Sequence, residues 1–144
     1  MAKSQGRTVA QSAVEMVEVV LPNDANPLGN MLGGKVMHLI DIAGAVAAHR
    51  HARSQVVTVA VDNLDFLYPI RVGELIVLRA HITRAFRTSM EAEVRVYLED
   101  YLTGERRQTS SARLRARFRE AQPSISGLAV APNGLRPSVR RGGR

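Results

Sequence analysis

The chain has 144 residues, 45% of them apolar, which is enough for one domain with its own hydrophobic core. It has no cysteine, which excludes a thiolate nucleophile, a disulfide framework and a sulfur-ligated zinc site. It shows neither a secretory signal nor a run of about 20 uncharged residues, so we expect a cytoplasmic protein without a membrane span. The net charge of +7 would suit a nucleic acid, but three Phe, three Tyr and no Trp offer few stacking platforms, so we expect no nucleic-acid partner.

The predicted elements begin with a strand and a long apolar helix. Residues Ser12–Leu21 are rich in valine and end at Pro22, which predicts a strand. Turn-forming residues then predict a loop over Pro22–Leu32. From Gly33 to about His51 apolar residues recur at helical spacing on most sides, so this helix needs to be covered nearly all round.

Four further strands are predicted after the helix. Residues Gln55–Leu64 are almost continuously apolar, as in a strand that is buried on both faces. The segments Leu75–Phe86, Thr88–Glu99 and Arg106–Arg119 alternate between apolar and polar residues and are separated by short turns. The expected fold class is therefore α+β, with a five-stranded antiparallel sheet folded around a single helix.

Charged residues alternate on the outward sides of the last two predicted strands. Glu91 and Glu93 point away from the core in one strand, and Arg113 and Arg115 do so in the other. Ion pairs between adjacent antiparallel strands add about 0.2–1 kcal/mol each. The row of arginines is thus explained first as a structural feature.

Residues 122–144 differ in composition from the rest of the chain. They contain four arginines and no acidic residue, so residues 1–121 carry a charge of only +3. They are also rich in Pro, Gly and Ser and show no periodicity. We therefore expect a flexible N-terminus over 1–11, a folded domain over 12–121 and a basic, disordered tail over 122–144.

The apolar strand Gln55–Leu64 predicts self-association. One of its faces can pack on the helix, but the other needs a second apolar surface. Another copy of the chain is the simplest source of that surface. We therefore expect a homo-oligomer.

One carboxylate lies in an unusual place within the predicted helix. Asp41 has Ile40 and Ile42 as neighbours, and a poorly solvated carboxylate is a stronger base than one in water. Alternatively, Asp41 marks a narrow solvent-exposed stripe or takes part in an ordinary ion pair.

A second set of candidate residues precedes the helix. Gly33 and Gly34 would begin it with unpaired backbone N–H groups that no side chain covers, which can hold an oxyanion, although paired glycines are more often only a turn. Asn26 adds an amide that could polarise a carbonyl or orient a water, or could simply form the turn of its loop.

The rise per residue of an α-helix gives the distance between Asp41 and the glycine pair. Gly34 and Asp41 are seven residues apart, which corresponds to about 10 Å along the axis. A base and an oxyanion donor that serve one carbonyl should each lie within about 3 Å of the reacting atoms. If both are catalytic, the site must therefore be composite, with Asp41 from one subunit and Asn26, Gly33 and Gly34 from another.

Two blocks of residues carry a family resemblance. The first reads N-x-x-G-N-x-x-G-G from Asn26 to Gly34 and continues to Asp41, and the second reads D-F-x-x-P-I-x-V-G from Asp65 to Gly73. Val57–Asp62 and Arg87–Met90 also match. Over about Ser12–Arg119 the chain resembles the hotdog-fold acyl-CoA thioesterases, in the branch of the bacterial and the mammalian cytosolic acyl-CoA hydrolases.

The resemblance implies a function as well as a fold. It implies hydrolysis of fatty acyl-CoA to fatty acid and coenzyme A without a cofactor, by dimers whose sheets join and which commonly form trimers of dimers. It also implies that Asp41 is the base or the nucleophile and that Asn26 lies opposite it across a subunit interface. For the coenzyme phosphates we select Arg84, Arg87 and Ser89, each of which is equally explained by ordinary solvation.

Two positions depart from the family pattern. Leu32 stands where relatives often have Phe or His, which bears on the preference for the acyl group. Phe86 replaces a glycine that usually precedes Arg-Thr-Ser, which bears on the coenzyme pocket.

Other functions have less support in the sequence. His38 and Asp41 could chelate a metal at i, i+3, but no further paired ligand accompanies them, so we expect no metal site. A dehydratase of the same fold would need a His and carboxylate pair that is not matched. The remaining alternative is a non-catalytic module that binds acyl-CoA or regulates, because a fold does not fix a function.

Overall fold

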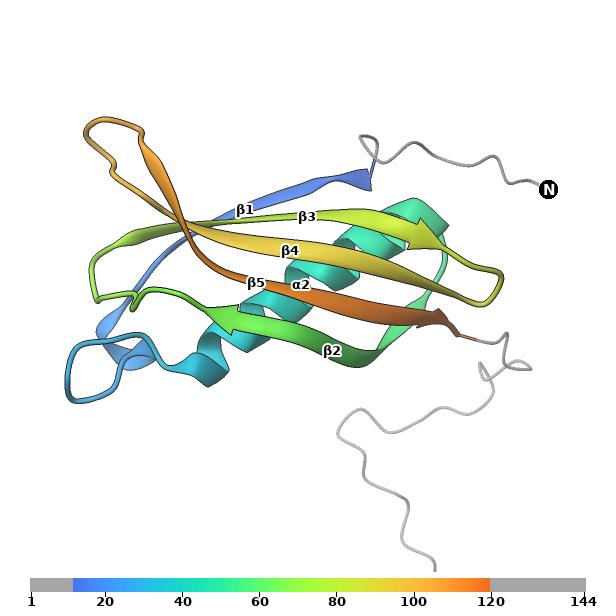
Figure 1. The fold of residues 1–144 in the computed structure, drawn as a ribbon, viewed down its shortest axis with the longest axis horizontal. Helices are drawn as coiled ribbons and strands as arrows, with labels where there is room; N and C mark the ends of the chain where they lie inside the picture. The colour runs from blue at the N-terminus through green and yellow to red at the C-terminus, as the bar shows by residue number, and fades with distance from the viewer. Residues whose placement is uncertain (1–11, 120–144) are drawn as a thin grey trace, which may run out of the picture.

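The computed structural model describes residues 12–119, which form one sheet and one long helix (Figure 1). The elements are β1 (Val14–Val19), the short 3-10 helix η1 (Pro22–Asp24), α2 (Gly33–Ala52), β2 (Val56–Phe66), β3 (Leu75–Ala85), β4 (Ser89–Glu99) and β5 (Arg106–Phe118). Each predicted strand and the predicted helix are confirmed to within two residues at either end. The flexible terminus predicted over 1–11 and the tail predicted over 122–144 lie outside the described residues.

The five strands form one antiparallel sheet in the order β1-β3-β4-β5-β2. Helix α2 crosses one face of this sheet diagonally, as Figure 1 shows. The predicted fold class is therefore confirmed. In the described part of the chain, no helix is long and apolar enough to cross a membrane.

The core lies between the helix and the inward-facing residues of β3, β4 and β5, as the alternating sequence predicts. Its fully buried side chains include Ile40, Ile76, Leu78, Met90, Val94, Val96 and Leu114. The helix approaches the sheet closely at Gly44, where an added Cβ would lie only 2.6 Å from Leu114 Cδ2. A larger residue at this crossing would require the Leu114 side chain or the helix to shift.

The outer face of the sheet carries ion pairs between β4 and β5, as predicted for one pair. Arg113 Nη1 lies 3.7 Å from Glu91 Oε2, and Arg106 Nε lies 2.8 Å from Glu99 Oε1, a pair that was not predicted. Arg115 Nη2 is 3.9 Å from an oxygen of Asp62 on β2. These pairs are solvent-exposed to different degrees, so each adds little to stability beyond cross-strand alignment.

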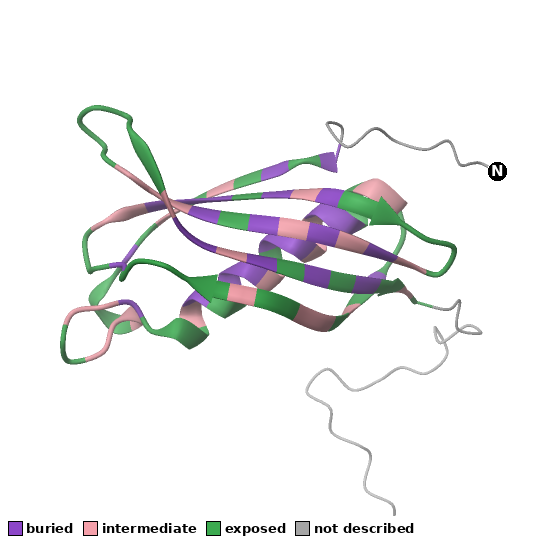
Figure 2. Ribbon diagram, viewed as in Figure 1, coloured by how far each residue is buried: buried purple, intermediate pink, exposed green. Residues whose placement is uncertain are grey.

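The prediction that both faces of β2 are buried is wrong for a single subunit. Val57 and Val59 point away from α2 and are exposed by 43% and 49%. β2 is also an edge strand, which is hydrogen-bonded to β5 alone. Figure 2 shows that exposed and half-buried residues make up most of this strand. Met37 and Ile42 on α2 are exposed too, so the helix is not covered all round within one subunit. An apolar edge strand beside an apolar helix face is typical of a surface that a partner covers.

Candidate functional site

Asp41 lies on α2 at the side that faces β2. Its carboxylate is half-buried, and its Oδ1 accepts a hydrogen bond of 2.7 Å from Thr58 Oγ1. Among residues 12–119, no basic nitrogen forms an ion pair with Asp41 within 4.0 Å. The ion-pair explanation of this carboxylate therefore finds no partner here. The second oxygen, Oδ2, is left to take part in chemistry.

Thr58 is a candidate that the sequence reasoning missed. It lies in the apolar strand β2, between Val57 and Val59, and it directs its hydroxyl to the helix. The available signal was a single hydroxyl in a run of valines, since a polar side chain in such a run needs a partner. The identity of that partner depends on how strand and helix pack, which the spacing along the chain does not give.

The start of α2 offers free backbone donors. Lys35 and Val36 donate to the Leu32 carbonyl at 3.0 and 3.2 Å, and no side chain caps the helix. The N–H groups of Gly33 and Gly34 have no acceptor among the described residues. A Cβ added to Gly34 would meet no atom within 4 Å. The helix start can therefore receive an oxygen that carries negative charge.

Asn26 has its side-chain orientation set by its own loop. Its Oδ1 accepts hydrogen bonds from the backbone N–H groups of Leu28, at 2.9 Å, and Asn30, at 3.1 Å. Two such donors can only face the oxygen of the carboxamide, so Nδ2 is the end that remains for a ligand. Asn26 is thus both the predicted turn former and a possible donor to a carbonyl oxygen.

The structure brings some predicted site residues together and keeps others apart. Gly34 and Asp41 lie on one uninterrupted helix, so about 10 Å separates them along its axis. Arg84, Arg87 and Ser89 lie at the β3–β4 turn, at the end of the sheet where α2 ends rather than begins (Figure 1). One subunit therefore does not assemble all the candidates at one place.

The turn between β3 and β4 borders a basic hollow of about 510 Å³. It is lined by Val59, Arg84, Phe86, Ser89, Glu91, Arg115 and Arg117. Within the described chain, neither Arg84 nor Arg87 has an acidic partner within 4.0 Å. Guanidinium groups that lack a carboxylate partner are suited to phosphate.

One histidine of α2, His49, has a local structural role. His49 Nδ1 lies 2.7 Å from the Ala45 carbonyl, and its Nε2 lies 3.4 Å from the Val56 backbone nitrogen. This geometry fits a tautomer with the proton on Nδ1, which links the end of the helix to the start of β2. No group of three His, Cys, Asp or Glu side chains in residues 12–119 could hold a metal ion.

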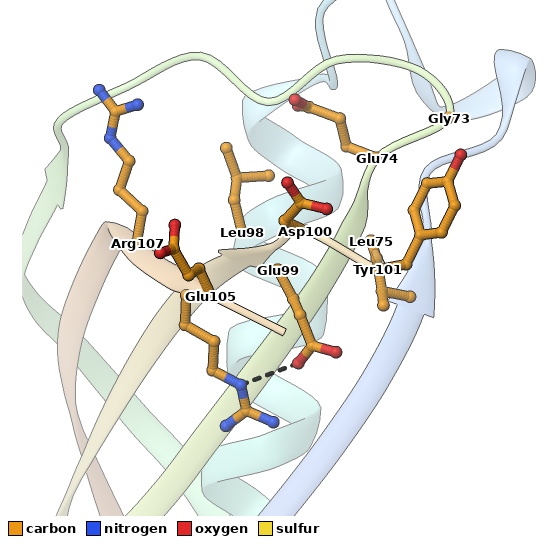
Figure 3. A pocket seen from close by; sticks show the side chains of 10 residues that line it. Gly73, Glu74, Leu75, Leu98, Glu99, Asp100, Tyr101, Glu105 and Arg107 are labelled. Atoms are coloured by element: carbon orange, nitrogen blue, oxygen red, sulfur yellow. Dashed lines mark hydrogen bonds and ion pairs between the residues drawn. The ribbon is translucent and has the colours of Figure 1, made fainter. Parts of the chain in front are cut away.

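A further hollow of about 400 Å³ lies between the start of β3 and the β4–β5 hairpin (Figure 3). Glu74, Glu99, Asp100 and Glu105 line it, and Arg106 on its wall already pairs with Glu99 and with Glu15 at 3.0 Å. None of the predicted site residues contributes to this hollow.

The chain is similar in sequence to known thioester hydrolases. Residues 28–105 match the model of the thioesterase superfamily. A mouse cytosolic acyl coenzyme A thioester hydrolase is 38% identical over 70% of this chain and 28% of its own length. An uncharacterized acyl-CoA thioester hydrolase of Bacillus subtilis is 36% identical over 74% of this chain. The chain spans only 62% of that protein, so it covers less than two thirds of either relative.

Solved structures share the arrangement of strands around one helix. Acyl-CoA hydrolase from Staphylococcus aureus, in complex with butyryl coenzyme A and coenzyme A, is 30% identical and superposes with a TM-score of 0.77 over 79% of this chain and 70% of its own. A hexameric acyl-CoA thioesterase is 39% identical, with a TM-score of 0.77 over 81% of this chain and 75% of its own.

Variants of the S. aureus enzyme have also been solved, each with alanine in place of one asparagine, aspartate or threonine. In that protein the asparagine precedes the aspartate by 15 residues and the threonine follows it by 17. Asn26, Asp41 and Thr58 have the same spacing here. On the match to more than half of its residues, and on the shared fold, the chain belongs to the thioesterase superfamily.

Proposed function

We propose that this protein hydrolyses acyl-CoA thioesters at a composite site between two subunits. The observation that carries the proposal is the hydrogen bond from Thr58 to Asp41. Together with Asn26, these residues have the same spacing along the chain as the three residues that were replaced in the S. aureus hydrolase. The names of the relatives support the same substrate class.

In the proposed reaction, Asp41 Oδ2 removes a proton from a water molecule as the water oxygen attacks the thioester carbonyl carbon. The carbonyl oxygen becomes an oxyanion, which accepts hydrogen bonds from the backbone N–H of Gly34, beside that of Gly33, and from Asn26 Nδ2. Collapse of this intermediate breaks the C–S bond and releases coenzyme A as a thiolate and the acyl group as a carboxylic acid. The proton held by Asp41 then passes to the thiolate or to solvent, which restores the carboxylate. No cofactor takes part, since the coenzyme is a portion of the substrate.

The separation of Gly34 and Asp41 along one helix requires two subunits for this reaction. We place Asp41 of one subunit opposite Asn26, Gly33 and Gly34 of another. One edge of β2 is free to pair with a second copy, and pairing of two β2 strands through these edges supports this arrangement because it would bring the two helices side by side. By analogy with the hexameric relative, three such dimers would form the complete assembly.

The pairing of two β2 strands also decides which subunit would bind the coenzyme phosphates. Within one subunit the basic hollow lies at the opposite end of the sheet from Gly34 (Figure 1). Antiparallel pairing of β2 strands places that end of the partner subunit beside the start of α2. The proposed phosphate contacts, Arg84, Arg87 and Ser89, would therefore come from the subunit that supplies Asp41.

Replacing Arg84 tests this assignment. For R84A we expect the KM for an acyl-CoA to rise about 5- to 30-fold, because a charge-assisted hydrogen bond to phosphate is worth about 1–2 kcal/mol at an accessible site. The KM for the corresponding acyl-pantetheine, which lacks the nucleotide, should not change. R79A serves as the control, since Arg79 lies near Glu15 on the outer face of the sheet, at 3.9 Å. Equal effects on both substrates would contradict the assignment.

Replacing Thr58 tests the position of the base. The near-isosteric T58V variant removes the donor to Asp41 Oδ1. We expect kcat to fall about 10- to 100-fold, which corresponds to the usual contribution of a hydrogen bond to a charged group, with little change in KM. Serine keeps the hydroxyl, and T58S should therefore retain most of the rate. If T58S and T58V were equally slow, the hydroxyl would not be what positions Asp41.

Release of free thiol from a panel of acyl-CoAs tests the overall proposal. Hydrolysis identifies an enzyme, whereas binding without hydrolysis would favour the alternative, a non-catalytic acyl-CoA-binding module. The free oxygen of Asp41 and the free donors at Gly33 and Gly34 favour the enzyme. We further propose a cytoplasmic location, which the name of the mouse relative supports.

A further inference from the structure

An apolar hollow of about 270 Å³ opens beside the start of α2. It lies between the helix and the segment that follows β2, at the end of the sheet where β2 finishes (Figure 1). Its lining consists of Asn30, Met31, Gly33, Val36, Phe66, Leu67, Tyr68, Pro69 and Ile70. Neither the predicted catalytic carboxylate nor the phosphate-binding candidates belong to it.

The walls of this hollow differ in how far they are buried. Met31, Val36 and Ile70 belong to the buried core. Phe66 and Leu67, on the other side, are 50% and 57% exposed. Large apolar side chains exposed together around a hollow are typical of a surface that an apolar ligand covers.

The hollow is held open by contacts within the subunit. The N–H of Leu67 donates to the buried Thr109 carbonyl at 2.7 Å, and the N–H of Met31 donates to the Ile70 carbonyl at 2.6 Å. The guanidinium carbon of Arg107 lies 4.0 Å from the centre of the Tyr68 ring, which holds that ring by a cation–π contact. The site is therefore formed before a ligand arrives.

The hollow reaches the start of the helix. Gly33 lines it, and a Cβ at this glycine would lie 3.9 Å from Phe66 Cζ. A carbonyl carbon whose oxygen is held by the first N–H groups of α2 would thus sit at the mouth of the hollow. The apolar chain on that carbon could therefore enter the hollow directly.

We propose that this hollow binds the acyl chain of the substrate and that Phe66 and Leu67 set the chain length. This inference rests on the proposed thioesterase function. A methylene needs about the volume of a water molecule, about 30 Å³, so the hollow holds about nine such groups. The expected substrates are short- and medium-chain acyl-CoAs, of up to about ten carbons.

The chain-length profile of the wild-type enzyme gives the first test. Each methylene that enters the hollow should raise kcat/KM about fourfold, the equivalent of about 0.8 kcal/mol of burial. We expect this rise from butyryl- to about decanoyl-CoA and no further rise for myristoyl- or palmitoyl-CoA. A rise in kcat/KM that continued to palmitoyl-CoA would contradict the proposal that this hollow limits the length of the acyl chain.

Two variants change the hollow in opposite directions. Removing the ring in F66A should shift the optimum by at least two carbons toward longer chains, and the larger side chain in L67W should shift it toward shorter ones. Y101A removes a large aromatic side chain, 74% exposed, from the β4–β5 hairpin, away from the hollow, and should leave the profile unchanged. Circular dichroism and light scattering establish that each variant keeps its fold and assembly.

The outcomes separate this inference from the proposed function. Hydrolysis with identical profiles in wild type, F66A and L67W would refute the acyl hollow and leave the thioesterase intact. A change of assembly size in F66A and L67W without a change of profile would instead indicate that a second subunit fills the hollow. If no acyl-CoA were hydrolysed, calorimetric titration with butyryl-, decanoyl- and palmitoyl-CoA would still decide whether affinity follows chain length and shifts in F66A.

Discussion

Replacing Asp41 by asparagine should lower kcat for acyl-CoA hydrolysis at least 100-fold while leaving the fold and the assembly unchanged. The carboxamide has the shape of the carboxylate but cannot take a proton from water, and loss of a general base costs about two to four powers of ten. Thr58 can still donate to the remaining oxygen, so the packing of α2 on β2 is retained. The measurement is thiol release under saturating substrate, together with a thermal melt.

The matched control for this variant is D62N. It makes the same chemical change on β2, at a residue whose carboxylate lies on the outer face, 3.9 Å from Arg115. Its turnover should equal that of the wild type. Undiminished hydrolysis by D41N would remove Asp41 from the mechanism, whether as base or as nucleophile. After single-turnover hydrolysis in ¹⁸O-labelled water, label in the Asp41 side chain would identify it as a nucleophile, because a general base gains no oxygen atom from water.

Mixing two inactive variants should restore activity. N26A lacks the proposed carbonyl donor and D41A lacks the base, so each homo-oligomer should be at least 100-fold slower than the wild type. In a dimer that contains one subunit of each, one of the two composite sites combines an intact Asn26 with an intact Asp41. Random pairing makes half of the dimers mixed, so turnover per subunit should recover to about one quarter of the wild-type value.

The restoration experiment depends on subunit exchange. Refolding an equimolar mixture from denaturant supplies it, and mixing the same folded variants without refolding provides the baseline. A mixture of D41A with the double variant N26A/D41A is the negative control, since no pairing of these chains contains an intact Asp41. If the refolded N26A and D41A mixture stayed inactive while refolded wild type recovered, both residues would serve a site within one subunit.

Much of the fold could be predicted because its signals are local. The alternation of Met90, Ala92, Val94 and Val96 defines the inner face of β4, and all four are buried. The helix begins at Gly33 as predicted because the glycines end the loop and the apolar period starts there. Such patterns depend only on how neighbouring side chains alternate or recur.

The place of β2 in the sheet could not be predicted from the same signals. A continuous apolar run indicates burial but does not tell whether the covering surface belongs to the same subunit. Val57 and Val59 are exposed because they face away from α2, on the side of the sheet that no described element covers. The edge position of β2 is decided by the order of all five strands. The prediction of a second copy drew on the same apolar surplus, and it stays a prediction.

The candidate site was only partly accessible from sequence for a related reason. Asp41 and the glycine pair stand out by their immediate neighbours, whereas Thr58 matters through a contact with a residue 17 positions away. The free end of Asn26 was likewise undetermined, because two backbone N–H groups of the folded loop decide which atom faces outward. Pairwise contacts of this kind follow from packing and not from periodicity.

The close approach at Gly44 ties the stability of the domain to the chemistry of its helix. Gly44 follows Asp41 by three residues, and the buried side chain of Leu114 occupies the space where a Cβ would lie. A larger residue here requires either the end of the Leu114 side chain or this turn of α2 to shift, and a shift of the turn would change the distance between the carboxylate and the hydroxyl on β2. A position that touches neither water nor thioester thereby helps to set the geometry of the candidate base.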